Sequence, residues 1–137
     1  MDVGAQINWV TCLSAVVNTV TIDIRPLSRA FENLESRAGS ILAMPFPDHS
    51  VPSLASLHVA EHIGLDRYGD PLDPLGTRKA ISELARVVAV GGSLYFGQPV
   101  GRPQVYFNAH RVHHTSAHHH GGVSCPMTEL ILRPLEE

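Results

Sequence analysis

Cysteine is nearly absent from this chain: its 137 residues contain two, Cys12 and Cys125. Two thiols cannot form a disulfide framework, so a small disulfide-rich secreted fold is excluded and reduced thiols in the cytoplasm are expected. No apolar run approaches the ~20 residues that a bilayer-spanning helix needs, and the N-terminus lacks the basic and apolar parts of a signal peptide. We therefore expect a cytoplasmic protein without a membrane-spanning segment.

An excess of charge is also missing, because 13 acidic and 10 basic residues give a formal net charge of −3. Such a chain has no general attraction for the phosphates of a nucleic acid or for an anionic membrane. A hydrophobic content of 44% and a charged content of 17% are ordinary for a globular protein, and the length suits one domain with a real core. Nucleic acids and membranes are thus not expected as partners, whereas homo-oligomerisation stays open.

Strand-like and helix-like segments alternate through the first two-thirds of the chain. After a strand end at Asp2–Ala5, runs of apolar and β-branched residues predict buried strands over Thr19–Ile24, Leu54–Val59 and Ser93–Phe96. Apolar residues at helical spacing predict helices over Gln6–Val17, over Ser28–Ser36, and between a cap at Asp73 and a stop at Gly91-Gly92. This order is typical of a mostly parallel α/β sheet with flanking helices.

The composition changes after Val112. Histidine and glycine dominate the next ten residues, and only Thr128–Leu132 again resembles a strand. We therefore divide the chain into an α/β domain over residues 1–112 and a His-rich divergent tail over residues 113–137. Without cysteines at ligand spacing, the histidines of this tail favour adventitious metal binding over a built metal site.

The segment Ser56–Gly64 begins as an apolar strand and ends in a carboxylate and two imidazoles. Parallel strands present functional groups at their carboxyl ends, so His58, Glu61 and His62 indicate a pocket. The same residues spell H-x-x-E-H, a zinc-peptidase pattern that needs both histidines on one face of a helix and the glutamate as base. A zinc hydrolase is a competing hypothesis, with Glu129 as a candidate third ligand. In the purely structural alternative, His58 packs in the strand and His62 caps a turn.

Acidic residues follow the first two strands of the predicted sheet. Asp2-x-Gly4 ends the first strand, and Asp23 ends the second. In nucleotide-binding α/β folds the first turn brings the backbone close to the ligand, and an acid after the second strand accepts hydrogen bonds from the ribose hydroxyls. The complete G-x-G-x-x-G of dinucleotide sites is missing here. A dinucleotide pyrophosphate needs that close glycine-rich approach to a helix N-terminus, whereas a ligand without phosphates does not.

Several of these strings, in chain order, resemble class I S-adenosylmethionine-dependent methyltransferases: DVG, Asp23, the PFPD loop, HVAEH, and ELARV with its GG. The chain resembles more closely a domain family of unknown function that is itself related to these enzymes. The strings that carry this resemblance are DIRPL, GSILAMPFPD, SLHVAEHIGLDRYGDPLDP, GGSLYFGQPVG and FNAHRV. The resemblance covers residues 2–112. It implies a Rossmann-like methyltransferase fold that is incomplete, since the match begins at the cofactor motif and omits most of the first strand.

The resemblance also implies S-adenosyl-L-methionine as the cofactor and assigns residues to it. In this assignment Asp2 and Gly4 belong to the motif after the first strand, and Asp23 holds the ribose. The adenine falls near Ser40 and Ile41, whereas His58 lies beside the methionine portion and the substrate.

The implied activity is methyl transfer to a small-molecule acceptor of unknown identity. A hydroxyl or amine acceptor must lose a proton, and His62, Glu61 or His58 is expected to accept it. Histidine is the better candidate because it titrates near neutral pH, and Glu61 then orients an imidazole or binds a polar group of the substrate. The alternative is a non-catalytic or degenerate member that binds the cofactor weakly or supports a partner chain, and a zinc hydrolase ranks third.

Overall fold

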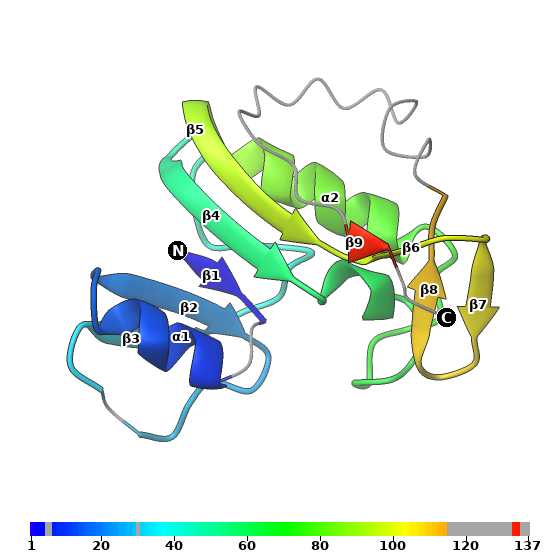
Figure 1. The fold of residues 1–137 in the computed structure, drawn as a ribbon, viewed down its shortest axis with the longest axis horizontal. Helices are drawn as coiled ribbons and strands as arrows, with labels where there is room; N and C mark the ends of the chain where they lie inside the picture. Colours follow the sequence, from blue (N-terminus) through cyan, green and yellow to red (C-terminus); the bar gives the residue numbers. More distant parts are fainter. Residues whose placement is uncertain (5–6, 30, 115–132, 135–137) are drawn as a thin grey trace.

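The computed structural model describes residues 1–4, 7–29, 31–114 and 133–134. Its centre is a five-stranded, wholly parallel sheet in the order β3-β2-β1-β4-β5 (Figure 1). The strands of this sheet are β1 (Asp2–Val3), β2 (Thr19–Asp23), β3 (Leu34–Ala38), β4 (Val51–Leu57) and β5 (Val88–Gly97). The expectation of a Rossmann-like α/β sheet is therefore confirmed.

Two helices cover opposite faces of this sheet. Helix α1 (Ile7–Ser14) lies over β2 and β3, and helix α2 (Gly76–Val87) lies behind β4 and β5 (Figure 1). Side chains alternate between the two faces of a strand, so successive residues of β4 and β5 point to opposite faces of the sheet. The core lies mainly on the α2 side, because Leu54, Leu94 and Phe96 are buried there with Leu84 of α2.

The helix expected between Asp73 and Gly91 is present at residues 76–87 and has a buried apolar face. Ala80, Leu84 and Val87 recur at three- and four-residue spacing and are fully buried. Burying a leucine of this kind stabilises the fold by roughly 1.5–3 kcal/mol. The predicted cap is displaced, since the helix begins at Gly76 and Asp73 Oδ1 accepts a hydrogen bond from Leu75 N at 2.9 Å in the preceding turn.

The predicted helix over Ser28–Ser36 is wrong. Leu34–Ala38 form β3, which pairs in parallel with β2 over the whole length of both strands. Asn33 has a φ of +59°, a left-handed conformation that interrupts a helix just before the strand. β3 lies at the edge of the described sheet and is mostly exposed, so its polar residues gave no strand pattern.

The predicted helix end at Gly91-Gly92 is also wrong. Helix α2 ends at Val87, and Val88 is already extended, with φ −65° and ψ 131°. The two glycines lie inside β5, where Gly91 has a φ of +75° and the pairing with β4 shifts its register between Val51 and Ser53. The pairing with β4 is thus irregular at these two glycines, whereas the change from helix to strand already takes place at Val88.

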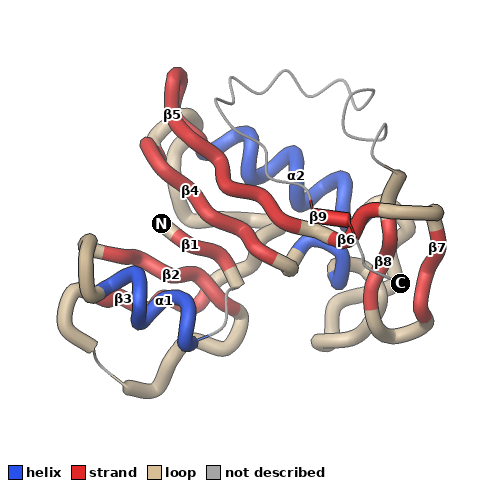
Figure 2. Tube along the Cα trace, viewed as in Figure 1, coloured by secondary structure: helices blue, strands red, loops and turns tan. Residues whose placement is uncertain are grey.

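Shorter elements follow the main sheet, and Figure 2 shows how they gather on one side of it. A single 3-10 turn, η1 (Ala60–His62), comes before a loop that leads to α2. Beyond the sheet, β7 (Gln104–Tyr106) and β8 (His110–Val112) form an antiparallel hairpin, and β6 (Pro99–Val100) pairs in parallel with β9 (Arg133–Pro134). The predicted strand over Thr128–Leu132 and His118–His120 lie outside the described residues.

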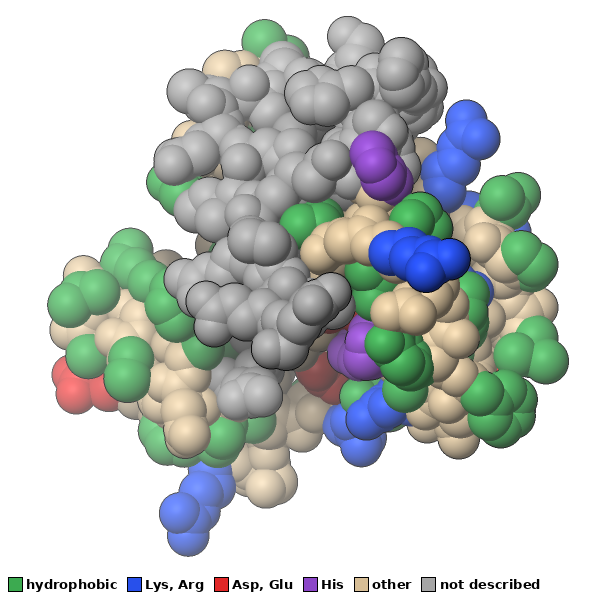
Figure 3. Space-filling view, turned by 45° about the vertical axis from the view of Figure 1, so that its right-hand side comes forward, with side chains coloured by type: hydrophobic (Ala, Val, Ile, Leu, Met, Phe, Trp, Pro, Cys, Tyr) green, Lys and Arg blue, Asp and Glu red, His purple; other side chains and the backbone are tan. Residues whose placement is uncertain are grey.

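Many of the exposed large hydrophobic side chains lie on two parts of the molecule. Figure 3 shows such side chains on the part of the molecule that carries α1 and on the part that carries the hairpin. They include Ile7, Trp9, Val16, Val17, Val105, Tyr106 and Phe107. Among the described helices, none is both long enough and apolar enough to cross a bilayer.

Candidate functional site

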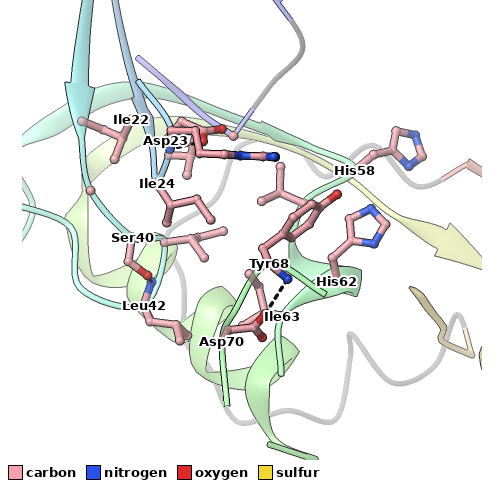
Figure 4. Close-up of a pocket in the computed structure, with 16 residues that line it drawn as sticks. Ile22, Asp23, Ile24, Ser40, Leu42, His58, His62, Ile63, Tyr68 and Asp70 are labelled. Atoms are coloured by element: carbon pink, nitrogen blue, oxygen red, sulfur yellow. Dashed lines mark hydrogen bonds between the residues drawn. The ribbon is translucent and has the colours of Figure 1, made fainter. Parts of the chain in front are cut away.

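A cavity opens at the carboxyl ends of β1, β2, β3 and β4, which is where ligands bind in open α/β sheets. Its walls come from the segments just after these strands and from the loop between η1 and α2 (Figure 4). Six of the residues singled out from the sequence line it: Gly4, Asp23, Ser40, Ile41, His58 and His62. The structure therefore brings together segments that are far apart in the chain.

Gly4 forms the part of the wall that follows β1. Its N–H donates to Ile22 O at 2.8 Å, and its φ is +68°. A Cβ at this position would lie 2.8 and 2.9 Å from the two methyl carbons of Val59. Only glycine lets the backbone run this close to the cavity, as a ligand-binding turn requires.

Asp23 lies opposite this turn, at the end of β2. Its Oδ1 accepts a hydrogen bond from Arg25 N at 2.7 Å, which fixes the carboxylate at the rim of the cavity. Figure 4 shows Asp23 and Ile24 on one side of the cavity and the two histidines on the other. A carboxylate held there can accept hydrogen bonds from ligand hydroxyls.

Asp2 occupies a different position from the one that the sequence suggested. Its side chain is fully buried behind the wall, and its Oδ2 accepts a hydrogen bond from the Thr21 hydroxyl at 3.3 Å. Asp2 is not among the described residues that line the cavity. The two acids therefore do not frame the cavity together, and Asp23 is the one that faces it.

His58 and Glu61 form a hydrogen-bonded pair just after β4. His58 Nδ1 lies 3.1 Å from Glu61 Oε1, and because a carboxylate only accepts, the imidazole nitrogen donates. Glu61 is 1% exposed, and its Oε2 accepts no hydrogen bond from the described residues. His58 has a φ of +59°, an unfavourable backbone conformation for a histidine and one that clusters at functional sites.

His62 is held differently from His58. Its Nδ1 donates to Ala109 O, 2.5 Å away in the turn of the β7–β8 hairpin. Its Nε2 lies 4.0 Å from Glu61 Oε1, too far for a direct hydrogen bond. The ring meets those of Tyr68 and His110 edge-on, with centroids 6.0 and 6.4 Å away. His62 thus forms a wall between the cavity and the hairpin.

Two further wall residues, Tyr68 and Asp70, were not predicted from the sequence. Both lie in the loop between η1 and α2, which is rich in Gly, Pro and Asp, and long loops in compact domains are often functional. Asp70 accepts a hydrogen bond from Tyr68 N (Figure 4) and another from Gly64 N. The Arg25 guanidinium lies 5.0 Å from the centre of the Tyr68 ring, a cation–π contact that ties the loop to the end of β2.

Arg111 fixes the base of the same loop. Its guanidinium is buried and donates to the carbonyl oxygens of Ile63, Gly64 and Asp73. Arg111 therefore has a structural role behind the cavity.

The zinc-peptidase geometry is not present in the described part of the chain. His58 precedes η1 with a left-handed φ, so the two histidines do not share one face of an α-helix. Within the described residues, no group of three His, Cys, Asp or Glu side chains is placed to hold a metal ion. Glu129 lies outside these residues.

Comparison with known proteins identifies the family. The family model described as "Caenorhabditis protein of unknown function, DUF268" matches residues 7–117. The chain belongs to this family. No curated protein matches it.

Solved structures show the fold that this DUF268 member shares. The YcgJ protein from Bacillus subtilis is 23% identical, with a TM-score of 0.52, over 72% of this chain and 44% of that one. A second similar structure is a complex between the Haloferax volcanii Trm112 methyltransferase activator and a protein inferred to be a methyltransferase. The matching chain of this complex is 17% identical. Its TM-score is 0.52, over 94% of this chain and 53% of that one. The DUF268 chain thus has a methyltransferase-like fold and spans about half the length of these structures.

Proposed function

We propose that this chain binds S-adenosyl-L-methionine and belongs to a methyltransferase that acts on a small molecule. One observation carries the proposal: a single cavity at the carboxyl ends of β1, β2, β3 and β4 gathers Gly4, Asp23 and His58. The methyltransferase-like fold supports it.

The residues around the cavity suit this cofactor. The turn at Gly4 leaves room for a ligand against the backbone, and the Asp23 carboxylate suits the ribose hydroxyls. Ile41 and Ser40, which follow β3, offer an apolar wall and a hydroxyl where the adenine is expected. Asp2 would act indirectly, since its hydrogen bond with Thr21 joins β1 to β2 below the turn.

The chemistry that a bound S-adenosylmethionine supplies is an activated methyl carbon, open to in-line displacement. The protein must align the acceptor and remove its proton. We assign proton removal to His58, because its Nδ1 is committed to Glu61 and its Nε2 therefore carries the lone pair. Glu61 is the positioning residue, and His62 closes the wall beside them.

A non-catalytic or degenerate family member is the second candidate function. The chain spans about half the length of the structures that it matches, and one of these was solved as a complex with a methyltransferase activator. In this reading the chain binds the cofactor weakly or supports a partner chain.

Titration with S-adenosylhomocysteine in a calorimeter tests the proposal. We expect saturable binding to the wild-type chain and about tenfold weaker binding to Asp23→Asn, since one charged hydrogen-bond acceptor is lost. Asp66→Asn is the matched control: Asp66 is exposed, does not line the cavity and has a φ of +59° that asparagine tolerates.

Two results would count against the proposal. Absence of heat and of competition at millimolar S-adenosylhomocysteine would remove the cofactor. Equal weakening by Asp23→Asn and Asp66→Asn would show that the loss of a negative charge, rather than contact at Asp23, sets the affinity.

A further inference from the structure

A second cavity lies on the face of the sheet that carries α1, between this helix and strands β4 and β5. Its volume is about 790 Å³, within the range of small-molecule sites. The residues of β4 and β5 that form its floor alternate with those of the core: Ser53, Ala55, Leu57, Tyr95 and Gly97 face it, whereas Leu54, Leu94 and Phe96 face α2. The second cavity therefore lies on the α1 face of the sheet, whereas the first lies beyond the carboxyl ends of the strands.

The walls of this second cavity are apolar and aromatic. Trp9 and Leu13 of α1 and Val17 beyond it face Leu57 and Tyr95. Among the described lining residues, no side chain carries a permanent charge. The amino group of Met1 donates to Ser53 O at 2.9 Å, and burial lowers its pKa. These walls suit an uncharged aromatic compound, because no lining side chain offers a permanent charge to pair with a charged ligand, and the one ammonium there already donates to Ser53 O and is disfavoured by burial.

His58 joins the two cavities, since it lines both of them. Its position at the end of β4 places one imidazole at the edge of the proposed cofactor site and at the edge of the apolar cavity. A methyl-transfer site needs this arrangement, because donor and acceptor must approach one reaction centre from different sides.

We infer that the acceptor is an uncharged aromatic alcohol that binds in this second cavity with its hydroxyl at His58. The inference rests on the proposed function. The hydroxyl proton passes to His58 Nε2, and the oxygen forms a bond to the methyl carbon. The electron pair of the broken sulfur–carbon bond returns to sulfur, so the products are a methyl ether and S-adenosylhomocysteine.

The chain carries its own probe of this cavity. Trp9 is its one tryptophan, so its indole N–H gives a single cross-peak in a ¹H–¹⁵N correlation spectrum. Titration with 2-naphthol, on the chain saturated with S-adenosylhomocysteine, is expected to shift this peak in a saturable way. The anion 2-naphthoate and the polar alcohol glucose are expected to leave it in place.

Two neighbouring valines provide the matched variants. Val17 lines the cavity and is 51% exposed, whereas Val16 is 82% exposed and is not among its lining residues. Val17→Asp is expected to weaken 2-naphthol binding at least about tenfold, because it places a charge against the aromatic ligand. Val16→Asp is expected to change it less than about twofold.

Several results would overturn the inference. If S-adenosylhomocysteine binds and the Trp9 peak never moves, the acceptor site is elsewhere and the proposed cofactor site survives. Competition between the two ligands would place them in one cavity. Equal effects of the two valine variants would indicate nonspecific binding, and a Trp9 peak that shifts with protein concentration would make this face a contact between copies. Failure of S-adenosylhomocysteine itself to bind would remove the proposed function as well.

Discussion

At the residue scale, two positions beside the cavity have backbone conformations that most residues avoid. Gly4 follows β1 with a φ of +68°, and His58 follows β4 with a φ of +59°. The glycine adopts this conformation without strain, whereas such a conformation costs a histidine on the order of 1–3 kcal/mol. The hydrogen bond from His58 to the buried Glu61 compensates part of that cost. The strain is consistent with a functional role at His58.

Gly4→Ala tests how far the cavity depends on this turn. We expect about 2–4 kcal/mol of destabilisation and weaker S-adenosylhomocysteine binding, because the new methyl group would strain the backbone and overlap Val59. Gly69→Ala is the control, since Gly69 has a φ of +82° but nothing lies within 4 Å of the position of its Cβ. The control is expected to cost about 1 kcal/mol in urea unfolding. Equal losses of stability in the two variants would mean that the Val59 side chain moves aside at no cost in free energy.

At the element scale, an ion-pair network joins α2 to the loop before β4. Arg86 donates to both carboxylate oxygens of Glu83, to Asp48 at 2.6 Å and to the carbonyl oxygens of Met44 and Phe46. Glu83 Oε1 also accepts from Met44 N at 2.8 Å. One helix residue thus holds a loop that has few regular backbone hydrogen bonds of its own.

This network predicts a pH dependence of stability. The hydrogen bonds from Arg86 hold the pKa of Glu83 below its ordinary value, although burial opposes this. A carboxylate with a lowered folded-state pKa stabilises the fold above its unfolded pKa of about 4.3, and this stability is lost as the pH falls through the folded pKa. Urea unfolding of Glu83→Gln should therefore give a stability about 1–2 kcal/mol below wild type at pH 7, and this difference should shrink progressively as the pH is lowered below about 4.3. A difference that does not change with pH would show that the charge of Glu83 contributes nothing.

The elements also show what sequence patterns can and cannot predict. Buried elements such as α2 and β4 have strong apolar periodicity, so they were predicted with errors only at their ends. The edge strand β3 buries little, and its pairing with β2 rather than its own residues makes it a strand. In the site, strand-end residues such as Asp23 follow from the order of elements. Tyr68 reaches the cavity only through the path of its loop, which no local pattern specifies.

At the scale of the whole molecule, the hairpin β7–β8 and the loop at residues 63–75 depend on one buried guanidinium. Arg111 lies on β8 and is 8% exposed. Besides its carbonyl partners it donates to the Thr77 hydroxyl at 3.3 Å, at the start of α2. The hairpin, the cavity loop and α2 are therefore tied together, and the position of Tyr68 in the cavity wall depends on this connection.

Arg111→Ala should loosen this whole region while leaving the sheet intact. It would remove a charged donor from four hydrogen bonds and leave the Ile63 carbonyl oxygen without this partner, whereas Gly64 O and Asp73 O keep backbone donors, so we expect about 3 kcal/mol of lost stability. Hydrogen exchange is expected to accelerate over residues 63–75 and 104–112, whereas the amides of β4 and β5 keep their relative protection. Arg102→Ala, at an exposed site just before the hairpin, should leave exchange unchanged. Uniform acceleration across the sheet in Arg111→Ala would instead show that the hairpin and the loop unfold only together with the core.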